Sequence, residues 1–215
     1  MSDELLSYSH RHYGMDHERY EWSMLQDRAP VAWPEDKPLA LWINIAVQHF
    51  PLSGEKPEVA PPGALTMPYP DLRHYTLRDY GNRVGIYRLL KVMAECEAQP
   101  SLAISGALAQ RYPKLLERLA RTPYEWLGHG WNMLAMHAGK VDLEVESNWI
   151  SQTRAALEGF TDQTLAGWLS PGRIQTENTP ELLVSNGFTY QSDWVNDELP
   201  YAFKTRAGNM TCLPS

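Results

Sequence analysis

The residue with the strongest catalytic character is His129, which follows an apolar stretch and stands between Gly128 and Gly130. An imidazole exchanges protons near neutral pH, and flanking glycines let a reacting group approach the backbone closely. Glu125, four residues earlier, could orient this histidine or could face solvent. The alternative is a structural histidine that is hydrogen-bonded in a tight turn. We predict that His129 is catalytic, that Glu125 supports it, and that Trp131 lines the substrate cleft.

A polar pair, Gln48 and His49, follows the apolar stretch that begins at Leu39. The amide of Gln48 does not titrate, so it cannot act as a base or as an anionic ligand. His49 could supply a base, but side chains alternate across a strand, so it would point away from Gln48. It could equally pack beside Phe50. We predict that Gln48 and His49 both bind substrate.

Four residues in the later part of the chain also suit a substrate site. Asp193 could act as a base or orient His129, although an aspartate at this kind of position can simply form a turn. Arg173 has a planar guanidinium that can bind an anionic group, or it is merely exposed. We predict Asp193 as the catalytic partner of His129, and Pro171, Arg173 and Trp194 as substrate-binding residues.

The spacing of apolar residues predicts the elements that must position these side chains. Near-continuous apolar runs predict buried strands, and apolar residues three and four apart predict helices. Strands alternate with helices along this chain, which predicts an α/β fold with a parallel sheet and a ligand site at the carboxyl ends of its strands. The predicted strands lie within 39–50, 101–105, 124–130, 164–172, 188–194 and 208–215, and the predicted helices within 83–98, 106–122, 142–158 and 179–187.

Composition limits the classes of partner. The chain has 215 residues, 43% of them hydrophobic, and a formal net charge of −7, which suits one globular domain. Nucleic acids and anionic membranes attract basic surfaces, so neither is an expected partner. No apolar run reaches the roughly 20 residues of a membrane span, and the charged N-terminus does not resemble a secretory signal. We expect a cytoplasmic protein that binds a small molecule or a sugar.

Five segments covering roughly residues 32–205 resemble the polysaccharide deacetylase superfamily (carbohydrate esterase family 4), and within it the allantoinase-like, metal-independent branch. The segments are NIAVQHF, RDYGNRVGIYRLL, EWLGHGW, GWLSPGRIQTENTPELL and GFTYQSDWVNDELPY. The resemblance implies a distorted (β/α) barrel of about seven strands, incomplete at its C-terminus because the family's last motif would lie beyond residue 215. A barrel without its last strand exposes a sheet edge, which favours a homo-oligomer.

The resemblance also bears on a metal cofactor. In metal-dependent members an aspartate and two histidines hold a divalent ion, and the matching positions here are Gln48, His129 and Met133. Two of these three ligands are absent, so we expect no standard zinc site and no cofactor. His137 could reach back as a ligand if its loop folds over, and otherwise we place it on the loop surface.

These observations predict one function and leave two alternatives open. The predicted function is a hydrolase of non-peptide C–N bonds that acts on a small amide, ureide or N-acetyl substrate. The alternatives are a metal-dependent deacetylase with unusual ligands, and a catalytically inactive protein that binds a carbohydrate or small molecule. We expect an N-terminal extension over residues 1–37 and a catalytic domain over residues 38–215.

Overall fold

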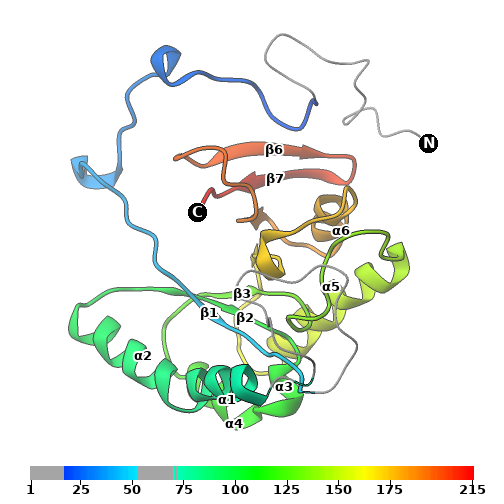
Figure 1. Ribbon diagram of the computed structural model, residues 1–215. Coiled ribbons are helices and arrows are strands. Elements are labelled where there is room, and N and C mark those ends of the chain that lie inside the picture. Colours follow the sequence, from blue (N-terminus) through cyan, green and yellow to red (C-terminus); the bar gives the residue numbers. More distant parts are fainter. Residues whose placement is uncertain (1–16, 53–69, 71) are drawn as a thin grey trace.

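The computed structural model describes residues 17–52, 70 and 72–215, and its centre is a seven-stranded sheet (Figure 1). The strand order is β1-β2-β3-β4-β5-β7-β6; all neighbours run parallel except β6 and β7, which are antiparallel. β1 and β6 form the two edges, so the sheet is open within the described residues. The strands are β1 (Asn44–Val47), β2 (Ser101–Ile104), β3 (Trp126–Gly128), β4 (Gly167–Trp168), β5 (Tyr190–Gln191), β6 (Tyr201–Thr205) and β7 (Gly208–Cys212).

Helices follow most of the strands, as expected for an α/β fold. In Figure 1 the helices α1 to α4 lie together below the first strands, and α5 and α6 lie beside the later ones. The helix predicted over 83–98 is wrong in its start, because a helix already begins at Leu72 and widens into a π-helical turn at Gly81–Gly85. The helices are α1 (Leu72–Tyr80), α2 (Ile86–Glu95), α3 (Leu108–Arg111), α4 (Pro113–Leu119), α5 (Leu143–Glu158) and α6 (Thr179–Ser185).

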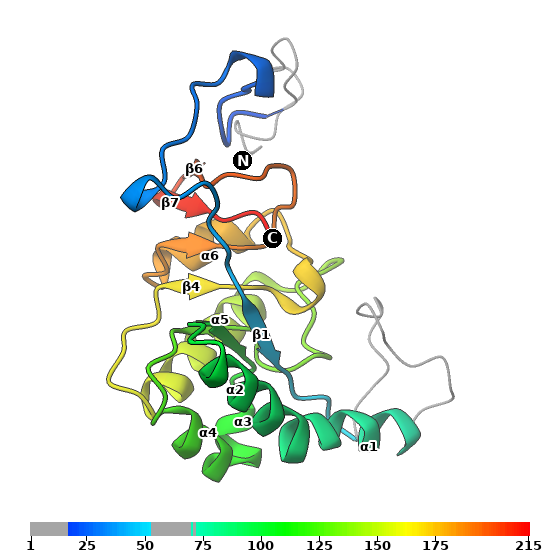
Figure 2. The ribbon, with the colours of Figure 1, turned by 90° about the vertical axis from the view of Figure 1, so that its left-hand side faces the viewer.

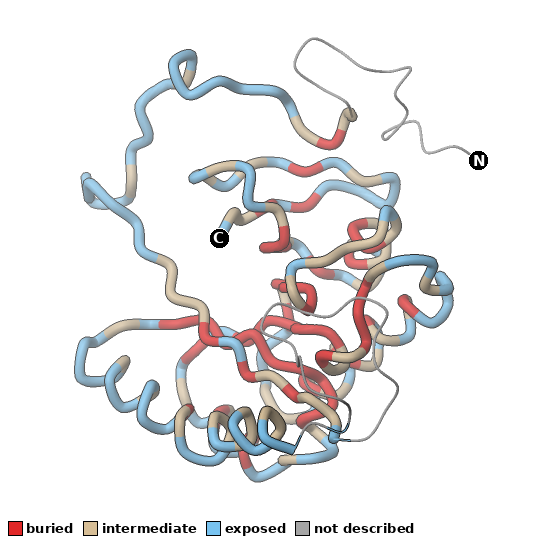
Figure 3. Tube along the Cα trace, in the orientation of Figure 1, coloured by how far each residue is buried: buried red, intermediate tan, exposed pale blue. Residues whose placement is uncertain are grey.

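The strand register gives the sheet two different faces. Val47, Ile104, Gly128 and Trp168 are successive partners across four strands, and this face packs against the helices in the main core. Side chains that alternate with them form the opposite face, where Ala103, Leu127 and Leu169 make a small second cluster. Figure 3 shows that buried residues concentrate along these central strands.

Part of the predicted extension over residues 1–37 lies within the described chain. From residue 17 to β1 the chain runs along the outside of the sheet, away from the helices below it (Figures 1 and 2). Arg19 is buried and donates to Glu181 on α6 at 3.0 Å, and Arg28 forms a two-pronged ion pair with Asp197 at 2.7 Å. These two arginines attach the segment to the second half of the chain.

The C-terminal part corrects one prediction. The sequence predicts a single strand within 208–215, whereas the structure forms a hairpin of β6 and β7. The missed strand, Tyr201–Thr205, is short and mostly unburied at the sheet edge, so its apolar pattern is weak. No helix among the described residues is long and apolar enough to span a membrane.

Candidate active site

His129 lies directly after β3, and its backbone amide continues the sheet by donating to the carbonyl of Ile104 at 2.9 Å. Its ring is 2% exposed and contacts two partners: Nδ1 lies 2.7 Å from the carbonyl oxygen of Leu169, and Nε2 lies 3.1 Å from Nε2 of Gln48. A carbonyl only accepts, so Nδ1 carries the proton and the Nε2 lone pair accepts from the Gln48 amide. Burial lowers the pKa of His129 to about 4, which keeps the imidazole neutral near pH 7.

Gln48 directly follows β1, and a contact with a second element also holds it in place. Its backbone carbonyl accepts from Nδ2 of Asn82, in the π-helical turn, at 2.9 Å. Gln48 and Asn82 line a cavity of about 250 Å³, together with Phe50 and Arg78, whose guanidinium lies 3.6 Å from the centre of the Phe50 ring. Gln48 therefore lines this cavity and also contacts His129, which is not among the lining residues.

His49 points elsewhere. It is buried, its ring meets Tyr112 edge-on at 6.1 Å, and its amide donates to Oγ of Ser105 at 3.3 Å. Burial lowers the pKa of His49 to about 4. Its carbonyl accepts from the amide of Met133 at 2.9 Å, which ties the loop after His129 to the end of β1. His49 is therefore packed in the protein interior. Its role in substrate binding remains a prediction.

Asp193 lies beyond β5 and fixes two segments with its two carboxylate oxygens. Oδ1 accepts from the backbone amide of Ser170 at 2.6 Å, and Oδ2 accepts from Nε2 of Gln175 at 2.5 Å. The carboxylate is largely buried, and burial raises its pKa to about 6 despite these hydrogen bonds. Gln175 also accepts from the indole N–H of Trp194 at 2.8 Å, which orients that ring.

The other predicted residues fall into two groups. Pro171 is buried against Gly130, and Trp131 is half-buried with its ring edge against Gly106, so both lie next to His129 in the loops at the carboxyl ends of the strands. Glu125 is exposed and precedes β3, at the opposite end of that strand from His129. There it accepts from the hydroxyl of Tyr190 at 2.7 Å. Glu125 is not positioned to orient His129.

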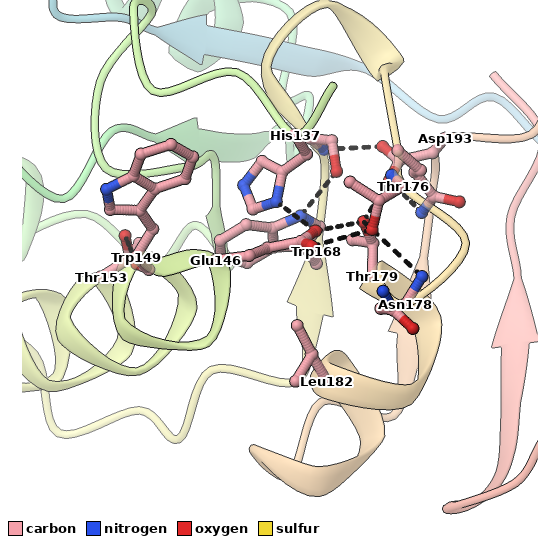
Figure 4. A network of polar contacts seen from close by, with 12 residues as sticks. His137, Glu146, Trp149, Thr153, Trp168, Thr176, Asn178, Thr179, Leu182 and Asp193 are labelled. Carbon is pink, nitrogen blue, oxygen red and sulfur yellow. Dashed lines mark hydrogen bonds and ion pairs between the residues drawn. The ribbon is translucent and has the colours of Figure 1, made fainter. Parts of the chain in front are cut away.

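A buried network that the sequence does not predict lies beside these residues (Figure 4). Nδ1 of His137 donates to Glu146 on α5 at 2.8 Å, and both side chains are completely buried. Glu146 also accepts from the hydroxyls of Thr176 at 2.8 Å and Thr179 at 2.5 Å, and these bonds help to keep its pKa below the usual range. The placement of His137 on the loop surface is therefore wrong, because the loop folds inward and packs its ring against Trp168.

The residues at the metal-ligand positions do not fit a divalent metal. Gln48 offers a neutral amide whose N–H occupies Nε2 of His129, and Met133 is a buried thioether, a poor ligand for a hard or borderline ion. His137 donates to Glu146 through Nδ1, and its Nε2 has no hydrogen-bond partner among the described residues, so it could offer a single ligand and no more. Within the described residues, no three His, Cys, Asp or Glu side chains are grouped so that they could hold a metal ion.

No protein-family model and no curated protein matches the sequence. Solved structures show that the fold is that of the polysaccharide deacetylases, which confirms the resemblance predicted above. A structure from Mycobacterium smegmatis, provisionally named a polysaccharide deacetylase, has 26% identity and a TM-score of 0.71 over 87% of this chain and 62% of that one. The structure of PuuE allantoinase has 21% identity and a TM-score of 0.74, over 100% and 68% of the two chains.

A third structure, a provisionally named polysaccharide deacetylase from Pseudomonas aeruginosa PAO1, has 22% identity and a TM-score of 0.72, over 100% and 69% of the chains. The present chain thus spans 62–69% of the length of these three proteins. What they share with it is the α/β fold.

Proposed function

We propose that this chain is a hydrolase of non-peptide C–N bonds in small amides, ureides or N-acetyl compounds, and that it works without the metal site of the metal-dependent relatives. The observation that carries the proposal is the contact between His129 and Gln48. In this contact a neutral imidazole presents the lone pair of Nε2 to the amide of Gln48, and Gln48 itself lines the cavity beside β1. The fold shared with PuuE allantoinase supports the same reaction class.

His129 would act as a general base at Nε2. In the proposed reaction a water molecule displaces the Gln48 amide from Nε2 and attacks the substrate carbonyl carbon as it gives its proton to the imidazole. The new C–O bond forms a tetrahedral intermediate, and the displaced Gln48 amide can donate to its oxyanion. The C–N bond then breaks, and the leaving nitrogen takes the proton from Nε2, which restores the neutral histidine.

The test is a substrate panel on protein stripped of metal with a chelator. Allantoin, hydantoate and N-acetylglucosamine are each incubated with the wild type. The readouts are ring opening of allantoin to a carboxylate, release of ammonia from hydantoate, and release of acetate from N-acetylglucosamine. The proposal expects turnover of at least one class without metal, a loss of at least 100-fold in His129→Ala, and no loss in Arg118→Gln, an exposed control on α4. Equal turnover by His129→Ala and wild type would refute it.

A second candidate is a small-molecule-binding protein without catalysis. The observation that favours it is that both ring nitrogens of His129 and both oxygens of Asp193 already have hydrogen-bond partners within the protein. Binding of a panel compound by calorimetry, with no turnover in any assay, would select this candidate over the hydrolase.

A further inference from the structure

The carboxylate of Glu146 on α5 receives hydrogen bonds from two loops beside the candidate site (Figure 4). His137, in the loop after β3, donates to Oε1 at 2.8 Å. Thr176, in the loop between β4 and α6, donates to Oε2 at 2.8 Å, and Thr179 at the start of α6 donates to Oε1 at 2.5 Å. The first loop begins with His129, so Glu146 joins the loop that carries His129 to the loop that precedes α6.

An ionised carboxylate is the group that fits these three donors. Each threonine hydroxyl already accepts from a backbone amide: Oγ1 of Thr176 from Asn178 at 3.0 Å, and Oγ1 of Thr179 from Thr176 at 2.9 Å. The single proton of each hydroxyl is therefore available to Glu146, which only has to accept. Burial alone would raise the pKa of Glu146, but the hydrogen bonds from His137 and the two threonines hold that pKa below its usual range.

The residue next to Thr176 carries this connection into the candidate site. Gln175 donates from Nε2 to Oδ2 of Asp193 at 2.5 Å, and its Oε1 accepts from the indole N–H of Trp194 at 2.8 Å. Asp193 and Trp194 line one cavity of about 400 Å³ together with Arg173. Because Gln175 and Thr176 are consecutive, a Thr176 hydroxyl held by the α5 carboxylate limits where the Gln175 amide can lie.

We propose that Glu146 is a positioning residue of the candidate site. It holds the loop before α6 from its fixed place on α5, so that Gln175 sets the orientation of Asp193 and Trp194. The helix suits this role because it is capped at its start and anchored in the main core. Glu146 acts through Thr176 and Gln175, and not by contact with a ligand. The inference concerns this geometry, so its test needs no turnover, and its failure would leave the proposed hydrolysis open.

The first test removes the link between the helix and the loop. Thr176→Val keeps the shape of the side chain without its hydroxyl, and Thr176→Ser keeps the hydroxyl. In the wild type, burial raises the pKa of Asp193 to about 6, and the hydrogen bond from Gln175 lowers it. Carbon NMR of the Asp193 carboxyl should show a pKa that is higher by roughly half a pH unit or more in Thr176→Val, because Gln175 moves away. Thr176→Ser should titrate like the wild type.

The second test addresses the carboxylate itself, through hydrogen exchange at the indole N–H of Trp194. Exchange should be at least about fivefold faster in Glu146→Gln and in Thr176→Val, the two variants that share the loss of the contact between these side chains. Glu144→Gln makes the same change at an exposed position of α5 and should exchange at the wild-type rate. The indole of Trp126, buried in the main core, reports on general loosening of the fold and should keep its wild-type rate.

Three results would overturn the inference. The first is a Thr176→Val protein in which Asp193 titrates as in the wild type. The second is a folded Glu146→Gln protein with unchanged exchange at Trp194. The third is equal acceleration at Trp194 and Trp126, which would mean that Glu146 only stabilises the fold. If Glu146→Gln does not fold, the milder Thr176→Val decides the question alone.

Discussion

His129 and Asp193 hold the two sides of a single peptide group. Nδ1 of His129 donates to the carbonyl of Leu169, and Oδ1 of Asp193 accepts from the amide of Ser170, the other half of the same peptide bond. Carbonyl and amide point in opposite directions in a trans peptide, so the two side chains lie on either side of it. The predicted catalytic pair is therefore connected through the backbone rather than by direct contact. Chained hydrogen bonds of this kind polarise one another.

The first prediction concerns this connection. In Asp193→Ala the Ser170 amide loses its buried acceptor, so the peptide moves and its carbonyl holds His129 less firmly. We expect nitrogen NMR to find the Nδ1–H tautomer of His129 in the wild type, and hydrogen exchange at Nδ1 to be at least tenfold faster in the variant. Asp197→Ala, which removes the partner of Arg28 in the same loop between β5 and β6, is the control and should leave that exchange unchanged. An unaltered rate in Asp193→Ala would show that the two residues are not coupled.

The second prediction concerns stability against pH. The pKa of His129 is about 4 in the folded chain and about 6.5 in an unfolded one, so the unfolded state binds more protons between these values. The contribution of His129 to the free energy of unfolding is fully present above pH 6.5. It decreases by about 3 kcal/mol as the pH falls towards 4. Asp193, with its raised pKa of about 6, acts in the opposite direction as the pH falls.

Comparison with His129→Gln isolates the histidine, because the contribution of Asp193 is common to both proteins. Denaturant unfolding at several pH values should show a smaller loss of stability in the variant than in the wild type between pH 6.5 and 4. Parallel curves for the two proteins would mean that His129 is not held neutral by burial.

The third prediction concerns the turn that holds His129. Gly130 has a φ of +64°, and a Cβ at this position would collide with the ring of Pro171. Gly130→Ala should therefore destabilise the protein by about 2–4 kcal/mol in denaturant unfolding. A Cβ at Gly81 meets no atom within 4 Å, so Gly81→Ala should be neutral or slightly stabilising. Equal stabilities of the two variants would contradict this explanation of the turn.

Part of this site can be predicted from short stretches of the sequence. Continuous apolar runs before Gln48 and before His129 predict two strands, and neighbouring parallel strands bring their carboxyl ends to one edge of the sheet. The shared cavity of Arg173, Asp193 and Trp194 also follows from residues at strand ends. Alternation of side chains correctly separates Gln48 from His49.

Other parts depend on packing that no local pattern encodes. His137 and Glu146 look like a loop residue and a surface residue at a helix start, and only the folded loop buries them together with Thr176 and Thr179. The Asp142 side chain caps the start of α5 by accepting from the amide of Glu144 at 2.8 Å, and this sets the helix on which Glu146 is buried. The prediction for Glu125 fails for the opposite reason. Glu125 is close to His129 in the sequence, but β3 lies between them, so the two side chains are at opposite ends of that strand.

If neutral His129 acts as a base without metal, the pH dependence of kcat/KM in metal-free buffer should report its protonation. With the best substrate of the panel, we expect kcat/KM to be constant from about pH 7.5 to 5.5. Below that it should fall with an apparent pKa near 4, where Nε2 becomes protonated. Activity that disappears with a chelator and returns with zinc, or a profile that lacks the acid limb, would contradict it.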